Sequence, residues 1–311
     1  GTYTENVVVD KSLVIRSENG AEQTIVQAAN TNADVFKVTA ENVTIDGFTV
    51  SGATSMGRSG IVIWGSSSGS CTVINNKCVG NNRGITMEVS TKDNTISKNT
   101  CTRNGYYGIY LTNATGNFIT DNICANNTDG SGFALYLADK ANNNTVSGNT
   151  SDSNKYGIRV KNAYSNTIFN NTSSNNDYGL EIATGSTGNV FYLNNFIGNT
   201  CELSLGYGAV AGNFWNSLTE MPYLFNGKQY NGYLGNYWSN YTGVDADSNG
   251  IGDTPYQTVQ TDSDNYPLMG QWDNGTIIAP VIPQIMLSCD SGIPGVTIFI
   301  TGSGFNADAA G

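Results

Sequence analysis

The stretch "NTISKNTC" (residues 94–101) contains neither an acidic side chain nor a histidine, yet close variants of it recur along the chain. The variants are "NFITDNIC" (117–124), "NTVSGNTS" (144–151) and "NTIFNNTS" (166–173). Within each stretch an apolar residue alternates with polar residues, which is the period-two pattern of a strand with one buried face. Asn, Gly and Ser separate the apolar positions, as turns require. The repeat therefore predicts short strands joined by turns.

The central apolar residue of this phrase recurs nine times, at intervals of 22 to 30 residues. These residues are Ile15, Ile45, Val73, Ile96, Ile119, Val146, Ile168, Phe191 and Trp215. A second apolar phrase follows, such as "RGITM" (83–87) or "YGIYL" (107–111). Two or three short strands in each repeat predict an all-β parallel β-helix of about nine to ten coils. A leucine-rich repeat would need a Leu-rich consensus that the chain lacks, and a helical solenoid would need longer amphipathic runs.

Five Asn residues hold one position on successive coils, each five residues after another Asn. They are Asn99, Asn122, Asn149, Asn171 and Asn194. Coils of a β-helix stack about 4.8 Å apart, so equal positions form columns along the axis. An Asn amide can donate to one neighbour and accept from the other, and Asn tolerates the conformation of tight turns. We interpret these residues as a structural ladder.

Composition restricts the possible functions. Only 13% of the 311 residues are charged, and the formal net charge is −11. Nucleic acids and anionic membranes reward clusters of Lys and Arg, so neither is expected as a partner. The chain has no histidine, which excludes histidine-based catalysis and histidine metal sites. It also has no run of 18 apolar residues, so no membrane span is expected in this segment.

Several longer phrases resemble known repeat families. They are "GTYTENVVVDKSLVIRS" (1–17), "ENVTIDGFTVSG" (41–52), "NYWSNYTGVDADSNGIGDTPY" (236–256) and "DSDNYPLM" (262–269). They are similar to phrases of the NosD-type periplasmic copper-binding and the carbohydrate-binding and sugar-hydrolase (CASH) repeats, which also occur in large archaeal surface proteins. The resemblance implies a right-handed parallel β-helix over residues 1–270, with a C-terminal capping region at about 206–270. It implies no single function, because the group includes enzymes, maturation factors and envelope proteins.

A second resemblance begins at Pro283. The stretch "PQIMLSCDSGIPGVTIFITGSGF" (283–305) resembles the first strands of an immunoglobulin-like IPT/TIG domain. The resemblance implies that residues 283–311 begin such a domain, as a partial Ig-like segment, and that residues 271–282 form a linker. Both ends of the chain fall in mid-pattern, so we expect it to derive from a longer precursor.

The segment "DADSNGIGD" (245–253) has the spacing of a calcium-binding loop. Asp245, Asp247, Asn249 and Asp253 would offer side-chain oxygens, and Ile251 would offer its carbonyl. Position 12 of the loop is Tyr256 instead of a bidentate Glu, so the segment is not an EF-hand. Two interpretations stay open: a weak extracellular calcium site that caps the β-helix, or a hydrogen-bonded Asp/Asn turn without metal.

The six cysteines fall into two sets. Cys78, Cys101 and Cys124 share one position on three successive coils, 23 residues apart. Stacked cysteines would lie wider apart than a relaxed disulfide allows, which favours buried free thiols over a strained disulfide or a soft-metal ladder. The second set lies at expected turns or in the C-terminal segment, and we expect it outside the core, available for disulfides between domains or subunits. It comprises Cys71, Cys201 and Cys289.

Four aromatic residues precede the second strand on consecutive coils. They are Tyr107, Phe133, Tyr156 and Tyr178. Such a stripe could stack sugars or bury against a partner, or it could stack on itself and cover the turn. On the same strands Arg159 and Glu181 are expected to pair across coils.

These observations favour a non-enzymatic structural subunit of an extracellular cell-envelope assembly, such as a surface layer, sheath or filament. We expect self-assembly into a homo-oligomer or polymer through the faces or ends of the β-helix, with intersubunit disulfides as one means, and with cell-surface glycans as a second kind of partner. N-x-S/T triplets, frequent in this Asn-rich chain, suggest a glycoprotein. The alternative is a polysaccharide-binding or polysaccharide-cleaving β-helix protein. A periplasmic copper-maturation factor is a third reading, disfavoured because soft ligands are few. Calcium is the only expected cofactor.

Overall fold

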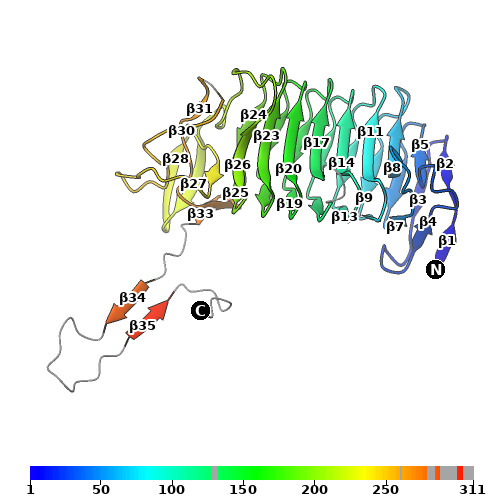
Figure 1. Ribbon diagram of the computed structural model, residues 1–311, viewed down its shortest axis with the longest axis horizontal. Coiled ribbons are helices and arrows are strands. Elements are labelled where there is room, and N and C mark those ends of the chain that lie inside the picture. Colours follow the sequence, from blue (N-terminus) through cyan, green and yellow to red (C-terminus); the bar gives the residue numbers. More distant parts are fainter. Residues whose placement is uncertain (128–131, 260, 279–283, 288–299, 304–311) are drawn as a thin grey trace.

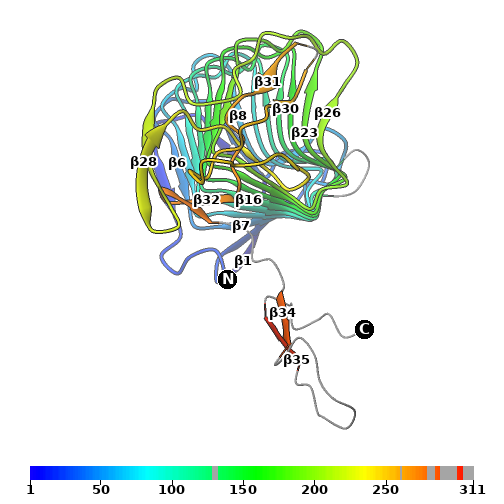
Figure 2. The same ribbon diagram turned by 90° about the vertical axis from the view of Figure 1, so that its left-hand side faces the viewer.

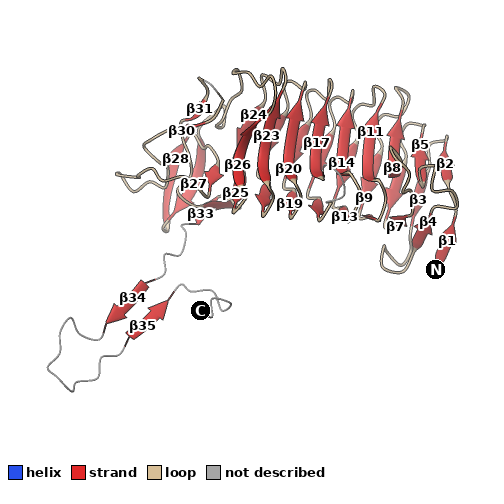
Figure 3. Cartoon of the chain, in the orientation of Figure 1, coloured by secondary structure: helices blue, strands red, loops and turns tan. Residues whose placement is uncertain are grey.

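The computed structural model describes residues 1–127, 132–259, 261–278, 284–287 and 300–303. All regular structure among these residues is β-strand (Figure 3). The strands of residues 1–205 form three parallel sheets that run along the long axis of the molecule (Figure 1). Seen end-on, the coils superpose (Figure 2).

Each coil contributes one strand to each sheet, so a strand pairs with the strand three places further along the chain. Sheet A contains β1 (Thr2–Thr4), β4 (Ile25–Gln27), β7 (Thr49–Ser51), β10 (Lys77–Val79), β13 (Thr100–Thr102), β16 (Ile123–Ala125), β19 (Thr150–Asp152), β22 (Thr172–Ser174), β25 (Asn195–Ile197) and β29 (Tyr237–Trp238). The exception to the three-place pairing is at the cap, where β25 pairs with β29. Sheet B contains β2 (Val7–Val9), β5 (Phe36–Val38), β8 (Ser59–Trp64), β11 (Arg83–Glu88), β14 (Tyr107–Thr112), β17 (Phe133–Ala138), β20 (Tyr156–Lys161), β23 (Tyr178–Ala183) and β26 (Cys201–Leu205). Sheet C contains β3 (Val14–Arg16), β6 (Thr44–Asp46), β9 (Thr72–Ile74), β12 (Thr95–Ser97), β15 (Phe118–Thr120), β18 (Thr145–Ser147), β21 (Thr167–Phe169) and β24 (Val190–Tyr192). The predicted parallel β-helix of about nine to ten coils is confirmed, with about nine coils in the structure.

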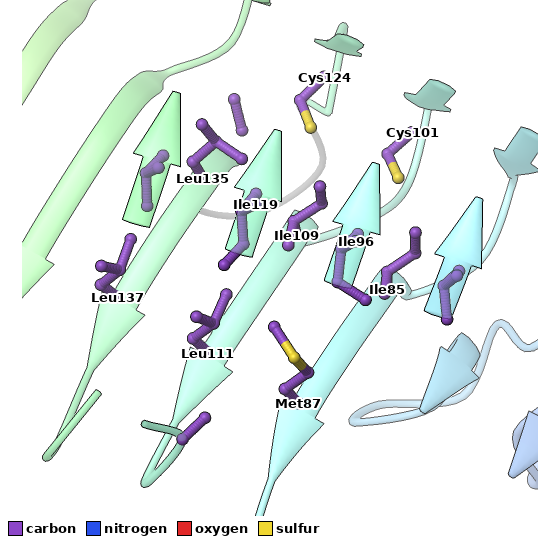
Figure 4. Packing of buried hydrophobic residues seen from close by; sticks show 14 of the residues in the cluster. Ile85, Met87, Ile96, Cys101, Ile109, Leu111, Ile119, Cys124, Leu135 and Leu137 are labelled. Carbon is purple, nitrogen blue, oxygen red and sulfur yellow. The ribbon is translucent and has the colours of Figure 1, made fainter. Parts of the chain in front are cut away.

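Apolar columns fill the space between the sheets. In sheet C, Ile96 pairs with Ile119, Ile119 with Val146, and Val146 with Ile168, and all four are buried. Sheet B supplies further columns, including Ile85 with Ile109 (Figure 4). Full burial of one such side chain is worth about 1.5–3 kcal/mol, so the repeat gains stability coil by coil.

A C-terminal cap follows β26. It contains a four-stranded sheet and a two-stranded sheet. The four-stranded sheet has the order β28 (Lys228–Gly232), β27 (Met221–Phe225), β33 (Thr276–Ile278) and β32 (Gln271–Asp273). The two-stranded sheet pairs β30 (Tyr256–Gln257) with β31 (Ser263–Asp264). Among the described residues no helix has the length and apolarity needed to cross a membrane.

The expected linker over 271–282 is wrong for residues 271–278. These residues form the hairpin of β32 and β33, with Trp272 and Ile277 buried in the cap. The cap therefore extends eight residues beyond the expected boundary at 270. Further on, β34 (Gln284–Leu287) pairs antiparallel with β35 (Ile300–Ser303). The rest of the segment 283–311 lies outside the described residues, so the IPT/TIG domain stays a prediction.

Candidate functional site

Asparagine side chains form three columns, each at a corner where two sheets meet. The first column holds Asn94, Asn117, Asn144, Asn166, Asn189 and Asn213. The second holds Asn76, Asn99, Asn122, Asn149, Asn171, Asn194 and Asn236. The third holds Asn81, Asn104, Asn127, Asn154, Asn176 and Asn199. The sequence pattern predicts the second column and includes the residues of the first. The third column was not expected, although the spacing of five from Asn94 to Asn99 continues to Asn104.

Asn149 illustrates the geometry of these columns. Its Nδ2 donates to Asn171 Oδ1 at 2.9 Å and to the carbonyl of Ile119 at 2.8 Å. Its Oδ1 accepts from the backbone N–H of Asn122 at 3.0 Å and from Asn122 Nδ2 at 2.9 Å. Asn149 is buried, so each of these bonds satisfies a group that water cannot reach. The columns therefore hold consecutive coils at one register.

Although Asn tolerates the conformation of tight turns, the ladder Asn itself does not adopt it. The residue immediately before it does: φ is +54° at Lys98, +57° at Asp121 and +53° at Asn170. The left-handed residue turns the chain at the corner, which leaves the next side chain directed into the column. Gly, Asn and Asp adopt this conformation readily, so Asp121 and Asn170 suit their corners, whereas Lys98 carries backbone strain that the ladder bonds offset.

The aromatic stripe on the outer face of sheet B is stacked on itself. Ring centroids lie 5.4 Å apart for Tyr107 and Phe133, 4.7 Å for Phe133 and Tyr156, and 4.9 Å for Tyr156 and Tyr178. The interplanar angles are 22°, 16° and 18°. Each ring therefore covers the face of its neighbour, and ring edges point away from the sheet. A sugar stacks on a ring face, so the inner members of the stripe offer it no stacking surface.

Two arginines cover the same face. The Arg159 guanidinium lies 5.2 Å from the Phe133 ring and 5.1 Å from the Tyr136 ring, and Arg83 lies 5.5 Å from Tyr107. Arg159 forms an ion pair with Glu181 that lacks hydrogen-bond geometry. Burial raises the pKa of Tyr136 to about 12, opposed by the nearby Arg159 charge. Tyr136 is therefore neutral at physiological pH, and the geometry here is that of a packed surface layer.

In the loop 245–253 the carboxylates accept hydrogen bonds from the loop itself. Asp245 accepts from the backbone N–H groups of Asn249 and Gly250, at 3.0 and 2.8 Å. Asp247 accepts from Asn249 Nδ2 at 2.9 Å, and Asp253 accepts from the N–H of Ala246 at 2.7 Å. Asn249 Oδ1 accepts from the N–H of Ile251 at 2.8 Å. This is the geometry of the hydrogen-bonded turn, and calcium binding stays a prediction.

Cys78, Cys101 and Cys124 lie in register inside the β-helix. Cys78 pairs with Cys101, and Cys101 with Cys124, across sheet A. All three are buried free thiols. Figure 4 shows two of them, Cys101 and Cys124, on neighbouring strands. Neighbouring thiol contacts and burial raise the pKa of Cys78 well above its usual value, and the contact with Cys124 together with burial does the same for Cys101. These groups pack as small apolar side chains.

The second cysteine set divides. The expectation that Cys71 is an exterior cysteine is wrong, because Cys71 is 1% exposed. It occupies the place that Asn94 holds one coil later, and its backbone N–H donates to Asn94 Oδ1. Cys201 is half-buried, continues the aromatic stripe beside Tyr178, and is a free thiol. Cys289 lies outside the described residues. Pairing between subunits stays a prediction for Cys201 and Cys289.

Comparison with known proteins identifies the family. The sequence profile described as "periplasmic copper-binding protein (NosD)" matches residues 2–139 and 90–243. The chain belongs to the NosD family. Together these matches cover the β-helix and the beginning of the cap of this NosD-family chain. No curated protein matches the sequence.

Solved structures similar to this NosD-family chain include a bacteriophage tailspike, tailspike protein 2 from the Escherichia coli O157:H7 bacteriophage CAB120. It is 13% identical, with a TM-score of 0.46 over 66% of this chain and 37% of the tailspike. The complex of XylC with xylose is 15% identical, with a TM-score of 0.49 over 72% of this chain and 40% of XylC. The periplasmic alginate epimerase AlgG is 18% identical, with a TM-score of 0.39 over 61% of this chain and 46% of AlgG. The chain thus spans less than half the length of each of these proteins.

The family description names copper, and the donors of this chain do not suit it. Histidine is absent from the sequence. The stacked thiols are buried, and their raised pKa keeps Cys78 and Cys101 protonated, whereas copper binds the thiolate. Across the described part of the chain, no group of three or more Cys, Asp or Glu side chains converges to hold a metal ion. We therefore derive no copper chemistry for this NosD-family member.

Proposed function

We propose that the chain is a structural element of an extracellular cell-envelope assembly, such as a surface layer, sheath or filament. The observation that carries the proposal is the continuity of the three amide columns, which hydrogen-bond consecutive coils from Asn76 to Asn236. Buried amide ladders resist bending and sliding of one coil against the next, because either motion breaks several bonds at once. A rod of this kind serves as a spacer or lattice member.

The outer face of sheet B supports the same proposal. Its rings stack on one another, and its arginines lie over those rings. Phe133 and Tyr136 are only 4% and 7% exposed, so their side chains pack against neighbouring coils and stiffen the rod. Half-buried Cys201 at the end of the stripe is the described thiol best placed to reach another subunit.

The first test is the state of association of the native protein. Size-exclusion chromatography with light scattering, over a wide range of protein concentration, should show ordered association into oligomers. Non-reducing gels compared with reducing gels, on wild type and Cys201→Ser, show whether a disulfide locks the contact. A protein that stays monomeric at every concentration, in both redox states, contradicts the proposal.

A second candidate function is polysaccharide binding or cleavage. The specific observation in its favour is the pairing of Arg83 with Glu88, at 3.8 Å, and of Arg159 with Glu181, beside tyrosines on one face. A glycan array, together with a uronate-cleavage assay with and without a chelator, tests this candidate. Specific binding or release of unsaturated product that is lost in Arg83→Ala and Arg159→Ala would favour it over the structural role.

A further inference from the structure

All three amide columns have the same direction. Each Asn donates, from Nδ2 and from its backbone N–H, to the Oδ1 atom of the Asn one coil closer to the C-terminal cap. For Asn122 toward Asn149 these distances are 2.9 and 3.0 Å. For Asn154 toward Asn176 they are 3.2 and 2.8 Å. Every column therefore ends, on the side of the cap, with hydrogen-bond donors that have no further Asn to receive them.

The beginning of each column is closed by ordinary backbone. The Oδ1 atoms of Asn76, Asn81 and Asn94 accept backbone N–H groups at 3.0, 3.1 and 2.9 Å. The donors are Phe48, Ala53 and Cys71. A neutral N–H suffices there because the terminal group of the column is the Oδ1 atom of an Asn, which accepts a hydrogen bond.

The opposite end of each column meets a carboxylate. Asn199 Nδ2 donates to Glu202 Oε2 at 2.6 Å. The backbone N–H of Asn213 donates to Asp262 Oδ2 at 3.0 Å, and the N–H of Gly212 donates to the same carboxylate. The backbone N–H and Nδ2 of Asn236 donate to Asp264 Oδ2 at 2.8 and 3.2 Å. The three acids lie 3, 49 and 28 residues after their Asn. Glu202 belongs to β26, the last strand of sheet B, whereas the cap brings Asp262 and Asp264 to the other two column ends.

A carboxylate suits this place because an ionised carboxylate only accepts hydrogen bonds. Asp264 receives two more donors, Trp238 Nε1 at 3.0 Å and the N–H of Tyr266 at 3.1 Å. An amide or hydroxyl in its place would direct a donor of its own toward donors. Burial raises the pKa of Asp264 to about 6, so the group is ionised at neutral pH in spite of its burial.

Glu202 occupies a position that the rod otherwise reserves for very small residues. In sheet B the equivalent residue is Gly157 and then Gly179 on the two preceding coils. A Cβ atom at Gly179 would lie 2.7 Å from Asn199 Nδ2, which belongs to the next coil. A long side chain fits at Glu202 because its carboxylate occupies the space that another column Asn would need. A further coil of the same pattern cannot stack there.

We propose that Glu202, Asp262 and Asp264 are terminators, which close the donor ends of the three amide columns and fix the C-terminal cap to the rod. This inference does not depend on the proposed function. It also restricts assembly: the cap end does not continue the β-helix into another copy, so contacts between copies use the lateral faces or the opposite end.

The test is hydrogen exchange measured by mass spectrometry on Glu202→Ala, Asp262→Ala and Asp264→Ala in the full chain. Loss of the acceptor, which is buried at Glu202 and Asp264 and half-buried at Asp262, should speed exchange of cap peptides within residues 221–278 about tenfold. Peptides of the middle coils, residues 95–125, should exchange as in wild type. The matched control is Asp152→Ala, which removes a carboxylate that accepts from Asn175 and Ser174 outside the columns. It should leave the cap unchanged.

Glu202→Gln separates the acceptor role from simple filling of space. Gln can accept from Asn199 Nδ2 and donate to the Ser239 hydroxyl, which is the other partner of Glu202. It should therefore restore most of the protection that Glu202→Ala loses. Equal exchange in the Ala and Gln variants, or cap exchange unchanged in Glu202→Ala and Asp262→Ala, would overturn the proposal. These two variants carry the test if Asp264→Ala does not fold.

Discussion

Replacement of Asn149 by Ala in the middle of the second column should weaken the rod far more than the loss of one polar side chain from a surface. The substitution removes the donors to Asn171 Oδ1 and to the carbonyls of Ile119 and Ser147. It also removes the acceptor of the Asn122 backbone N–H and one of the two acceptors of Asn122 Nδ2, which keeps its bond to the carbonyl of Ile96. At about 1 kcal/mol for each lost bond, and more where a buried group stays unpaired, the expected loss is about 3–5 kcal/mol.

The assay is urea unfolding followed by circular dichroism, with hydrogen exchange to locate the weakened coils. The control is Asn231→Ala, because Asn231 is exposed and its side chain donates one hydrogen bond, to Glu220. That variant should lose less than about 1 kcal/mol. Exchange should rise first in the coils on either side of residue 149. If Asn149→Ala lowers the free energy of unfolding no more than Asn231→Ala does, the amide columns do not stabilise the rod.

Four further predictions concern other parts of the molecule. The pKa of Asp264 is raised to about 6 in the folded protein, so between about pH 4 and about pH 6 the folded state holds a proton that the unfolded state has lost. The free energy of unfolding should therefore fall by up to about 3 kcal/mol as pH rises from about 4 to about 6, and then stay level. This slope, measured as the unfolding temperature against pH, should vanish in Asp264→Asn. In native protein a thiol reagent should modify Cys201 and leave Cys71, Cys78, Cys101 and Cys124 unmodified, as mapped by mass spectrometry; rapid labelling of Cys101 would contradict the buried column. Gly157→Ala should lower the free energy of unfolding in urea by at least about 1–3 kcal/mol, because the new Cβ would lie 2.0 Å from Ser173 Oγ. Gly232→Ala should lower it less, because the atom nearest to its Cβ would lie 3.6 Å away. If the loop 245–253 binds calcium, millimolar calcium should raise the unfolding temperature of wild type and have no effect on Asp247→Ala, whereas equal curves with calcium and with chelator favour the metal-free turn.

The rod could be predicted from the sequence because apolar residues and Asn recur at the same places in each coil. Ile96, Ile119 and Ile168 fix the inner face of one sheet, and the Asn residues that follow them fix the corner. The sequence pattern suggested that Cys71 lies outside the core, because it precedes a strand at a position typical of a turn. Its register with Asn94, which the 23-residue spacing already contains, places it inside.

The cap could be predicted from the sequence only in part. Residues 271–278 contain "DNGT", a hairpin turn signal between Trp272 and Ile277, and this local signal was available. The partners of Asp262 and Asp264 were not, because irregular cap segments that no repeat describes bring them to Asn213 and Asn236. The aromatic stripe could be found from its spacing. Whether its ring faces stack on one another or stay open to a ligand depends on side-chain rotamers, which spacing alone does not give.

Electron microscopy of the native particle would show whether this chain is a stiff building element. We expect rods of uniform length arranged side by side in a lattice, sheath or filament, with their cap ends free of end-to-end continuation. Isolated, unassociated molecules in native material would contradict it.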